Sequence, residues 1–262
     1  MTALASTPSL LRRLHRGTVA WLHSWWRLLQ FAVLMLSLAL TPASYSRDNR
    51  PTLARHVVND TAPNLAWFGV LSALVSLVLI RIVVVTSQSY GLSRFALEMV
   101  VRVLVLELIP LTAAAFVALR TTLPGGLEFS QGRNAGSATT EAELQREFFP
   151  RVAAGVFSVW MLAAVTCVLT LILAYLTLYG FTPWALAGYT RVVGQVFNPA
   201  VTMILVLKIV FFSFAVGLIP MASSFYFGAS YRSKVTHGLS DMVRLFAVIL
   251  LIEVASLMGN YY

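Results

Sequence analysis

The amino-acid sequence predicts an all-α integral membrane protein, with an N-terminal interfacial amphipathic helix followed by five transmembrane helices. Of the 262 residues, 58% are hydrophobic and 11% are charged, whereas about 25% are charged in an ordinary soluble domain. Three long stretches, residues 61–80, 152–190 and 209–231, contain no Asp, Glu, Lys or Arg. Because about 20 apolar residues suffice to cross the hydrocarbon core of a bilayer, several membrane crossings are expected.

The first element is predicted over residues 9–40, as a helix that lies in the membrane surface. On a helical wheel, a face rich in Trp and Leu lies opposite four basic or titratable residues: Arg12, Arg16, His23 and Arg27. This pattern is typical of an interfacial amphipathic helix. Its apolar end, residues 28–40, is too short to cross the bilayer comfortably. The Arg-rich start superficially resembles a signal peptide, and we expect it to be retained as mature structure.

The apolar runs that follow predict the transmembrane helices. Residues 1–60 are assigned to the interfacial helix and a connector, and residues 61–262 to the transmembrane domain. Within that domain, apolar runs predict five spans, over residues 64–86, 95–119, 152–179, 201–226 and 242–261.

Between the second and third spans, residues 121–150 form the one sizeable polar stretch. Its Pro124-Gly125-Gly126 segment predicts a loop. Thr140 and Glu143 have the spacing of a helix-capping pair, which predicts a short helix over residues 139–148. The stretch is too short for a catalytic domain.

The basic residues predict the orientation of the chain. They concentrate before the first span, in residues 121–150 and between the fourth and fifth spans, whereas the other loops hold only Arg94 and Arg191. By the positive-inside rule, the N-terminus and residues 121–150 are expected in the cytoplasm and the C-terminus on the outer side. The net charge of +9 is expected to meet anionic lipids rather than nucleic acid, because the basic residues flank apolar runs.

Charged residues within the predicted spans are the candidates for a functional site, because each costs a few kcal/mol or more unless it is paired or hydrated. There are six of them: Arg81, Glu98, Arg102, Glu107, Lys208 and Glu253. Their charges sum to zero. Four lie in the predicted outer half of the bilayer, and Glu107 and Glu253 lie nearer the middle. The set predicts a polar cavity open toward the outer side.

Structural explanations stay open for the same six residues. Glu98 and Arg102 are four residues apart, so they can neutralise each other on one helix face. Arg81 can reach the outer headgroups. A bridge between Lys208 and Glu253 can be purely structural.

Catalytic motifs are missing from the sequence. It has no P-loop and no G-x-S-x-G motif, and no pair of histidines has metal-ligand spacing on a helix. The single cysteine, Cys167, lies inside an apolar run and is expected to serve packing. We therefore expect a chain that is not an enzyme and binds no metal or cofactor itself.

Short motifs in the predicted spans resemble those of the MlaE family of ABC-transporter permeases, which move phospholipids or related lipids between membranes. The segment 106–110 (LELIP) resembles the family's R-E-L-G-P, and 118–120 (ALR), with Glu128 eight residues later, resembles A-G-R with its Glu. Further matches are 150–155 (PRVAAG) to P-R-x-x-A-G, 207–212 (LKIVFF) to I-K-S-x-x-F and 251–254 (LIEV) to L-x-D-F. The resemblance covers about residue 69 to the C-terminus.

This chain also departs from the family pattern at several positions. Leu106 stands where the family has Arg, Ile109 and Leu119 stand where it has Gly, and Ile209 stands where it has Ser. The Gly-rich acidic coupling segment is shorter than in the family.

The resemblance implies an MlaE-like homodimeric permease in a bacterial inner membrane. Cytoplasmic ATPase subunits, which use ATP and Mg, would grip residues 121–150, where the coupling candidates are Arg120, Glu128, Glu141 and Arg146. An MCE-domain protein would sit on the periplasmic face and exchange phospholipid with the permease, in a pathway to the outer membrane that serves its lipid asymmetry. Spans one and two would line the lipid pocket, with Glu107 near its base.

Two alternatives to phospholipid transport remain at this point. One is a permease of the same architecture for another hydrophobe, such as a sterol, a polyisoprenoid or an aromatic solvent. The other is a membrane scaffold that transports nothing.

Overall fold

The computed structural model describes residues 7–47, 49–92, 95–132, 143–227 and 234–261. All secondary structure in these ranges is helical. Five helical units are long and apolar enough to cross a membrane: Arg50–Ser89, Ala96–Phe129, Leu144–Tyr179, Pro199–Tyr226 and Gly238–Gly259. The prediction of an all-α membrane protein with five spans is confirmed.

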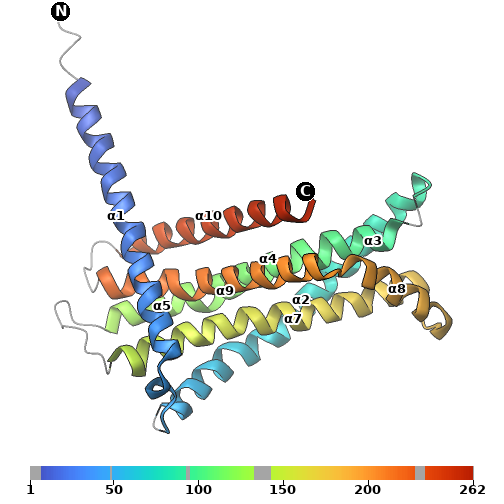
Figure 1. Ribbon diagram of the computed structural model, residues 1–262, viewed down its shortest axis with the longest axis horizontal. Helices are drawn as coiled ribbons and strands as arrows, with labels where there is room; N and C mark the ends of the chain where they lie inside the picture. Colours follow the sequence, from blue (N-terminus) through green and yellow to red (C-terminus); the bar gives the residue numbers. More distant parts are fainter. Residues whose placement is uncertain (1–6, 48, 93–94, 133–142, 228–233, 262) are drawn as a thin grey trace, which may run out of the picture.

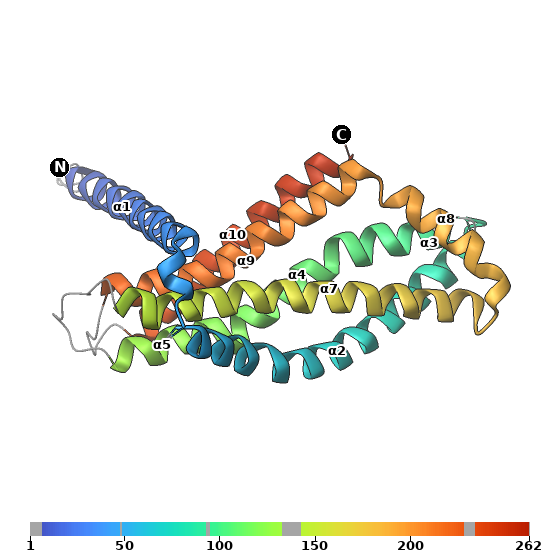
Figure 2. The same cartoon turned by 60° about the horizontal axis from the view of Figure 1, so that its bottom comes forward.

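The spans lie lengthwise beside one another, and helix α1 crosses them near one end (Figure 1). The main helices are α1 (Thr7–Leu40), α2 (Arg50–Ser89), α7 (Phe149–Tyr179), α9 (Pro199–Phe227) and α10 (Lys234–Tyr261). The second span is built from shorter pieces, α3 (Ala96–Val100) to α5 (Leu123–Gly132). We call the two ends of the bundle the α5 end, beside α1, and the α8 end, where α3 and α8 lie (Figure 2).

Helix α1 is continuous over the predicted range and packs on the bundle through one face. Phe31, Met35 and Leu38 are buried in a cluster with residues of α7 and α9. The ring of Phe31 lies 5.4 Å from that of Phe225, measured between centroids. A short 3-10 helix, Pro42–Tyr45, then leads toward α2.

The predicted boundary between residues 60 and 61 is wrong, because it falls inside α2. This helix begins at Arg50, well before the predicted start at residue 64. Pro51 occupies its first turn, where the missing N–H costs nothing and the fixed φ suits a helix. Pro63 lies inside the same helix. The helix therefore takes up most of the stretch assigned to the connector.

Prolines also shape the second span. It contains two π-helical segments, η3 (Val101–Leu108) and η4 (Ala118–Thr122), and a third, η5 (Leu144–Phe148), opens the third span. Each ends two residues before a proline: Pro110, Pro124 or Pro150. The residue just before each proline donates its N–H to the carbonyl five residues back. This wider turn relieves the clash that a proline makes inside a regular α-helix.

The loop predicted over residues 121–150 is therefore shorter than expected. The second span continues as helix α5 through Pro124, Gly125 and Gly126, because η4 accommodates the proline. Gly126 is needed for packing, since a Cβ there would lie 3.1 Å from Pro220 of α9. Of the short helix predicted over 139–148, residues 144–148 are helical as η5, but η5 continues directly into α7 and so forms the start of the third span. Thr140 lies outside the described residues.

One helix was missed by the sequence reasoning. Helix α8 (Leu186–Val196) follows a 3-10 turn, Pro183–Ala185, between the third and fourth spans. Tyr189 fixes it to α7 by donating its hydroxyl to the Leu171 carbonyl at 2.7 Å. Burial, with Tyr179 nearby, raises the pKa of Tyr189 to about 12, so the phenol keeps the proton that it donates.

Two kinds of contact hold the spans together. Helices α2 and α7 share buried hydrogen bonds, between Thr61 and Ser158 at 2.7 Å and between Ser76 and Thr170 at 3.0 Å. Helices α7 and α9 approach closely at a glycine, because a Cβ on Gly217 would lie 3.0 Å from a backbone oxygen of α7. Helices in a membrane commonly associate through small residues and hydrogen-bonded hydroxyl pairs, because apolar burial alone gives little specificity there.

Candidate functional site

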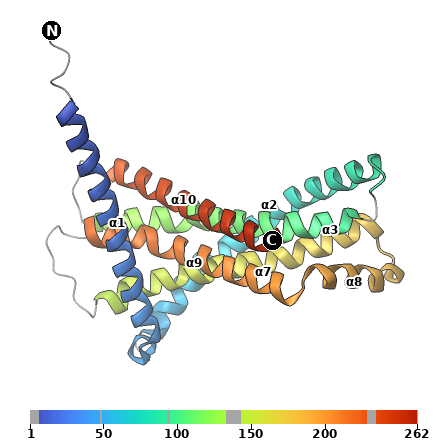
Figure 3. The same ribbon diagram turned by 45° about the horizontal axis from the view of Figure 1, so that its top comes forward.

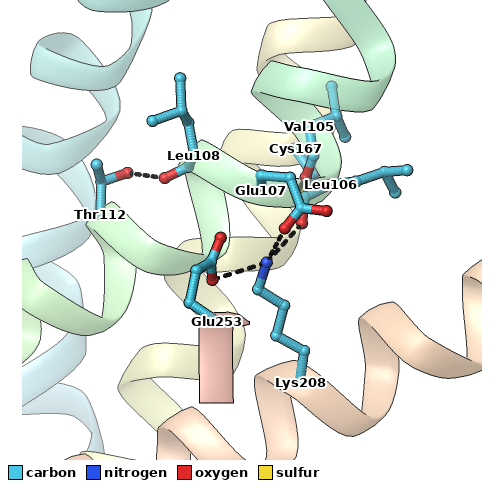
Figure 4. Close-up of polar contacts among 8 residues, drawn as sticks. All are labelled: Val105, Leu106, Glu107, Leu108, Thr112, Cys167, Lys208 and Glu253. Atoms are coloured by element: carbon cyan, nitrogen blue, oxygen red, sulfur yellow. Dashed lines mark hydrogen bonds and ion pairs between the residues drawn. The ribbon is translucent and has the colours of Figure 1, made fainter. Parts of the chain in front are cut away.

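Three of the predicted site residues meet in one buried cluster. Lys208 of α9 lies between Glu107 of η3 and Glu253 of α10 (Figure 4). Its ammonium group donates to Glu107 Oε2 and lies 2.8 Å from Glu253 Oε2. The Lys208 side chain is 1% exposed and each glutamate side chain 11%. The cluster therefore ties the second, fourth and fifth spans together.

A proline supplies a further partner of the lysine. Lys208 Nζ also donates to the carbonyl of Leu106 at 3.2 Å. In a regular α-helix that carbonyl would accept the N–H of residue 110, four positions on, but Pro110 has no N–H. The lysine thus binds a backbone oxygen that the proline leaves available.

The neighbouring Val105 carbonyl of η3 is likewise bonded by a side chain. Ile109 donates to Leu104 instead of Val105, and the Val105 carbonyl accepts the Cys167 thiol at 3.7 Å. The Leu108 carbonyl accepts the Thr112 hydroxyl at 2.7 Å. This bond between residues four apart is an ordinary contact within a helix, and Figure 4 shows it near the cluster. The π-helical segment is therefore an integral part of the site, because its displaced carbonyls are used.

The cluster lies closer to the α8 end than to the α5 end. Lys208 is nine residues from the start of α9, and Glu253 is eight residues from the end of α10. At ~1.5 Å per residue, both lie about 12–14 Å from the α8 end of their helices. The sequence predicted Glu107 and Glu253 nearer the middle of the membrane than Lys208, but in the structure all three lie at one level.

The charges in the cluster do not cancel. One ammonium group faces two carboxyl groups, which also interact with each other, so full ionisation gives a net charge of −1. A charge that is not compensated inside a membrane costs several kcal/mol. One proton on either carboxyl group would make the cluster neutral. The Leu106 side chain packs in an apolar cluster with Val101, Val105 and Val201, so it brings no basic group to these carboxyl groups.

The other three charged residues lie apart from the cluster. Glu98 accepts a hydrogen bond from Arg102 Nε at 3.0 Å, and their side chains are 38% and 36% exposed. This is the local pair that the spacing allowed. Arg81 is exposed on α2. The prediction of one open polar cavity formed by all six residues is therefore wrong for this conformation, because the three that do meet are buried and closed.

Comparison with known protein families identifies the family of this chain. The sequence profile of the family described as "Permease MlaE" matches residues 53–258, which is most of the chain. The chain belongs to the MlaE permease family. It is accordingly a multi-pass membrane protein and the permease subunit of an ABC transporter, not a catalytic enzyme. No curated protein matches the chain.

The described residues among those predicted to couple this permease to an ATPase lie toward the α5 end. Arg120 lies in η4, Glu128 in α5 and Arg146 in η5, and all three are exposed. The Arg120 guanidinium lies 5.8 Å from the centroid of the Phe116 ring. Glu141 lies outside the described residues. The α5 end thus presents both signs of charge to a partner.

Several contacts of the permease were not foreseen from the sequence. They are the hydroxyl pairs between α2 and α7 and the hydrogen bond from Asn64 to the Thr121 hydroxyl at 2.6 Å. They were not predicted because single polar residues are common in spans. A signal was present: Ser72 and Ser76 on α2, and Thr166 and Thr170 on α7, are four residues apart and buried, as expected for polar stripes along facing helices.

Proposed function

We propose that this permease moves phospholipids, and that the Glu107–Lys208–Glu253 cluster is the latch that closes its path. The observation that carries the proposal is the closed cluster itself. It joins three spans through one lysine with a side chain that is 1% exposed. A charged contact of this kind has two defined states, joined and separated, as alternating access requires.

The chemistry of the lysine suits a phospholipid. When η3 or α10 moves away from α9, the ammonium group of Lys208 loses a carboxylate partner and can bind the phosphate of a headgroup instead. The released carboxylate can bind the amine of a zwitterionic headgroup. The acyl chains would lie against apolar side chains of the spans. Exchange of partners keeps the cost of each charge low in both states.

The proposal includes partners that supply energy and receive lipid. Two copies of the permease would pair, and cytoplasmic ATPase subunits, using ATP and Mg, would dock on the α5 end through Arg120, Glu128, Glu141 and Arg146. An MCE-domain protein would dock at the α8 end, on the periplasmic face of a bacterial inner membrane. The support is the distribution of basic residues, which predicts a cytoplasmic α5 end, and the exposure of Arg120, Glu128 and Arg146.

The test is ATP-dependent transfer of a fluorescent phospholipid in vesicles that contain the whole complex. We expect Lys208→Met to slow transfer at least tenfold, and Arg81→Met, at an exposed arginine of α2 that lies apart from the cluster, to leave it unchanged. The exchanged pair Lys208→Glu with Glu253→Lys keeps a cation between two helices. We expect it to restore the folded protein but not transfer, because the ammonium group then moves with α10.

Two results would contradict the proposal. Transfer by Lys208→Met at the wild-type rate would remove the latch from the mechanism. Mass spectrometry of lipids that copurify with the complex checks the substrate: we expect phospholipid, and a sterol or polyisoprenoid in its place would contradict the substrate class.

A further inference from the structure

An apolar groove runs along helix α1. It has a volume of about 770 Å³ and lies between α1, α7, α9 and α10. None of its 22 lining residues carries a charged side chain. Leu29, Val33 and Leu36 of α1 line it and are each more than half exposed. The volume falls in the range of small-molecule binding sites, about 300–1,000 Å³.

The groove adjoins a recess near the α5 end with a volume of about 20 Å³, which is room for about one water molecule. Leu28 of α1 and Ile219 of α9 line both. The recess adds two serines and three charged residues: Ser24, Ser223, Arg27, Asp241 and Arg244. Helix α1 crosses α9 and α10 in this region (Figure 3). An apolar groove that ends in a charged recess has the polarity of a lipid.

The arginines of the recess keep donors available. The Arg27 guanidinium lies 5.7 Å from the centroid of the Tyr226 ring, and within the described part of the chain no carboxylate lies within 4.0 Å of it. Arg244 Nη1 lies 3.9 Å from Asp241 Oδ1, at the outer limit of an ion pair. Asp241 Oδ2 accepts the hydroxyl of Ser223. Two guanidinium groups against one carboxylate leave the recess with a net charge of +1.

We propose that the groove and recess together bind one anionic phospholipid. The phosphate lies at the mouth of the recess, which Arg27 and Arg244 line, because guanidinium groups match phosphate oxygens in charge and in donor geometry. The Ser24 hydroxyl is a further donor. The acyl chains occupy the groove against α1. Basic pockets between helices on the cytoplasmic side of a membrane are suited to anionic headgroups.

The net charge of the recess selects the headgroup. A headgroup with one negative charge neutralises it, whereas a zwitterionic headgroup leaves the surplus positive charge in place. The recess is separate from the latch, since Ser223 and Lys208 are 15 residues apart on α9, or about 22 Å along the helix. The far end of the groove reaches Phe211 and Ile252, near the latch. Lipid binding at this site does not depend on the transport proposal.

The experiment measures lipid binding to the purified, delipidated full-length chain by native mass spectrometry. Three probes are compared: phosphatidylglycerol, phosphatidylcholine with the same acyl chains, and glycerol phosphate as a headgroup alone. We expect phosphatidylglycerol to bind at least tenfold more tightly than either of the others. That comparison uses only the wild-type chain.

Variants then separate the two halves of the site. Arg27→Gln with Arg244→Gln is expected to remove the preference for phosphatidylglycerol, and the matched control, Arg81→Gln with Arg191→Gln, to keep it. Ala32→Leu with Ala153→Leu fills the groove from α1 and α7 and is expected to weaken binding of both lipids at least fivefold. Elution volume and melting temperature report whether each variant is folded.

Three results would overturn the inference. Equal binding of phosphatidylglycerol and phosphatidylcholine by the wild type would mean only a non-selective lipid coat. A preference that survives loss of both recess arginines would place the anionic headgroup elsewhere. Glycerol phosphate bound as tightly as the whole lipid would show that the groove takes no part.

Discussion

Glu98 and Glu107 lie nine residues apart on the second span and meet opposite environments. Glu98 pairs with Arg102 on its own helix, and both side chains are more than one third exposed. Glu107 pairs with Lys208 of another span, and the lysine side chain is 1% exposed. The first pair joins two groups that folding would hold near each other anyway. The second pair is part of the cluster with Glu253 that holds three separate helices in register.

The difference teaches how to weigh charges in a membrane chain. A pair within one helix gives only a few tenths of a kcal/mol, and exposed pairs give little. A buried charge has a large effect when its partner is removed, because it is then left without compensation. The effect of a substitution on stability should therefore depend on how buried the charge is and on how many helices it joins, more than on the presence of an opposite charge.

The largest effect is expected from Lys208→Met. It leaves two buried carboxylates without their cation, which should lower the free energy of unfolding by about 3–5 kcal/mol. Unfolding in mixed detergent micelles measures it. Arg102→Met, which removes a positive charge from the more exposed pair, is the matched control and should cost less than about 1 kcal/mol. Equal losses of unfolding free energy in the two variants would contradict the view that the buried pair matters more than the exposed one.

A smaller loss, about 1 kcal/mol, is expected from Glu253→Gln. Lys208 keeps Glu107 as its partner, and loss of one carboxylate removes the surplus negative charge while one charged hydrogen bond is weakened. The same unfolding assay measures it. A loss as large as that of Lys208→Met would mean that the lysine needs both carboxylates in their charged form.

Ser158→Ala tests a buried contact that carries no charge. It removes the hydrogen bond with Thr61, and interhelical hydrogen bonds in membranes average about 0.6 kcal/mol. Ser89→Ala is the control, since that exposed serine donates within its own helix, to the Val85 carbonyl. If Ser158→Ala proved as costly as Lys208→Met, burial alone would set the effect and charge would not matter.

The smallest effect is expected from Glu98→Gln, below about 0.5 kcal/mol. It should shrink further as salt is raised from 0.05 to about 0.5 M, because exposed charges are screened. The effect of Lys208→Met should not change with salt. A salt-dependent loss at Lys208 would show that water and ions reach the cluster.

Much of the fold could be predicted because membrane-spanning helices are recognisable from the length of their apolar segments. The number of spans and helix α1 followed from the sequence. The start of α2, the helical Pro124 segment and α8 did not. Proline and glycine were taken as helix breakers, and nothing local indicates that a π-helical turn precedes the proline or that a glycine faces another helix.

The candidate site was only half predictable, for a related reason. Spacing of four residues pointed to the Glu98–Arg102 pair, whereas the cluster needs three elements that are far apart in the chain. From the sequence, Glu107, Lys208 and Glu253 were expected to need compensation of their charges. The one pairing considered among them was a structural bridge between Lys208 and Glu253. The Leu106 carbonyl could not be foreseen without the path of the backbone before Pro110.

The π-helical segments change how this span must be read by experiment. A regular α-helix turns about 100° per residue, and a cysteine-accessibility scan would repeat with that period. Each wide turn delays the rotation, so the pattern of labelled positions along residues 96–132 should slip in phase before Pro110 and again before Pro124. A scan fitted with a single period would assign the far part of the span to the wrong wall of the protein.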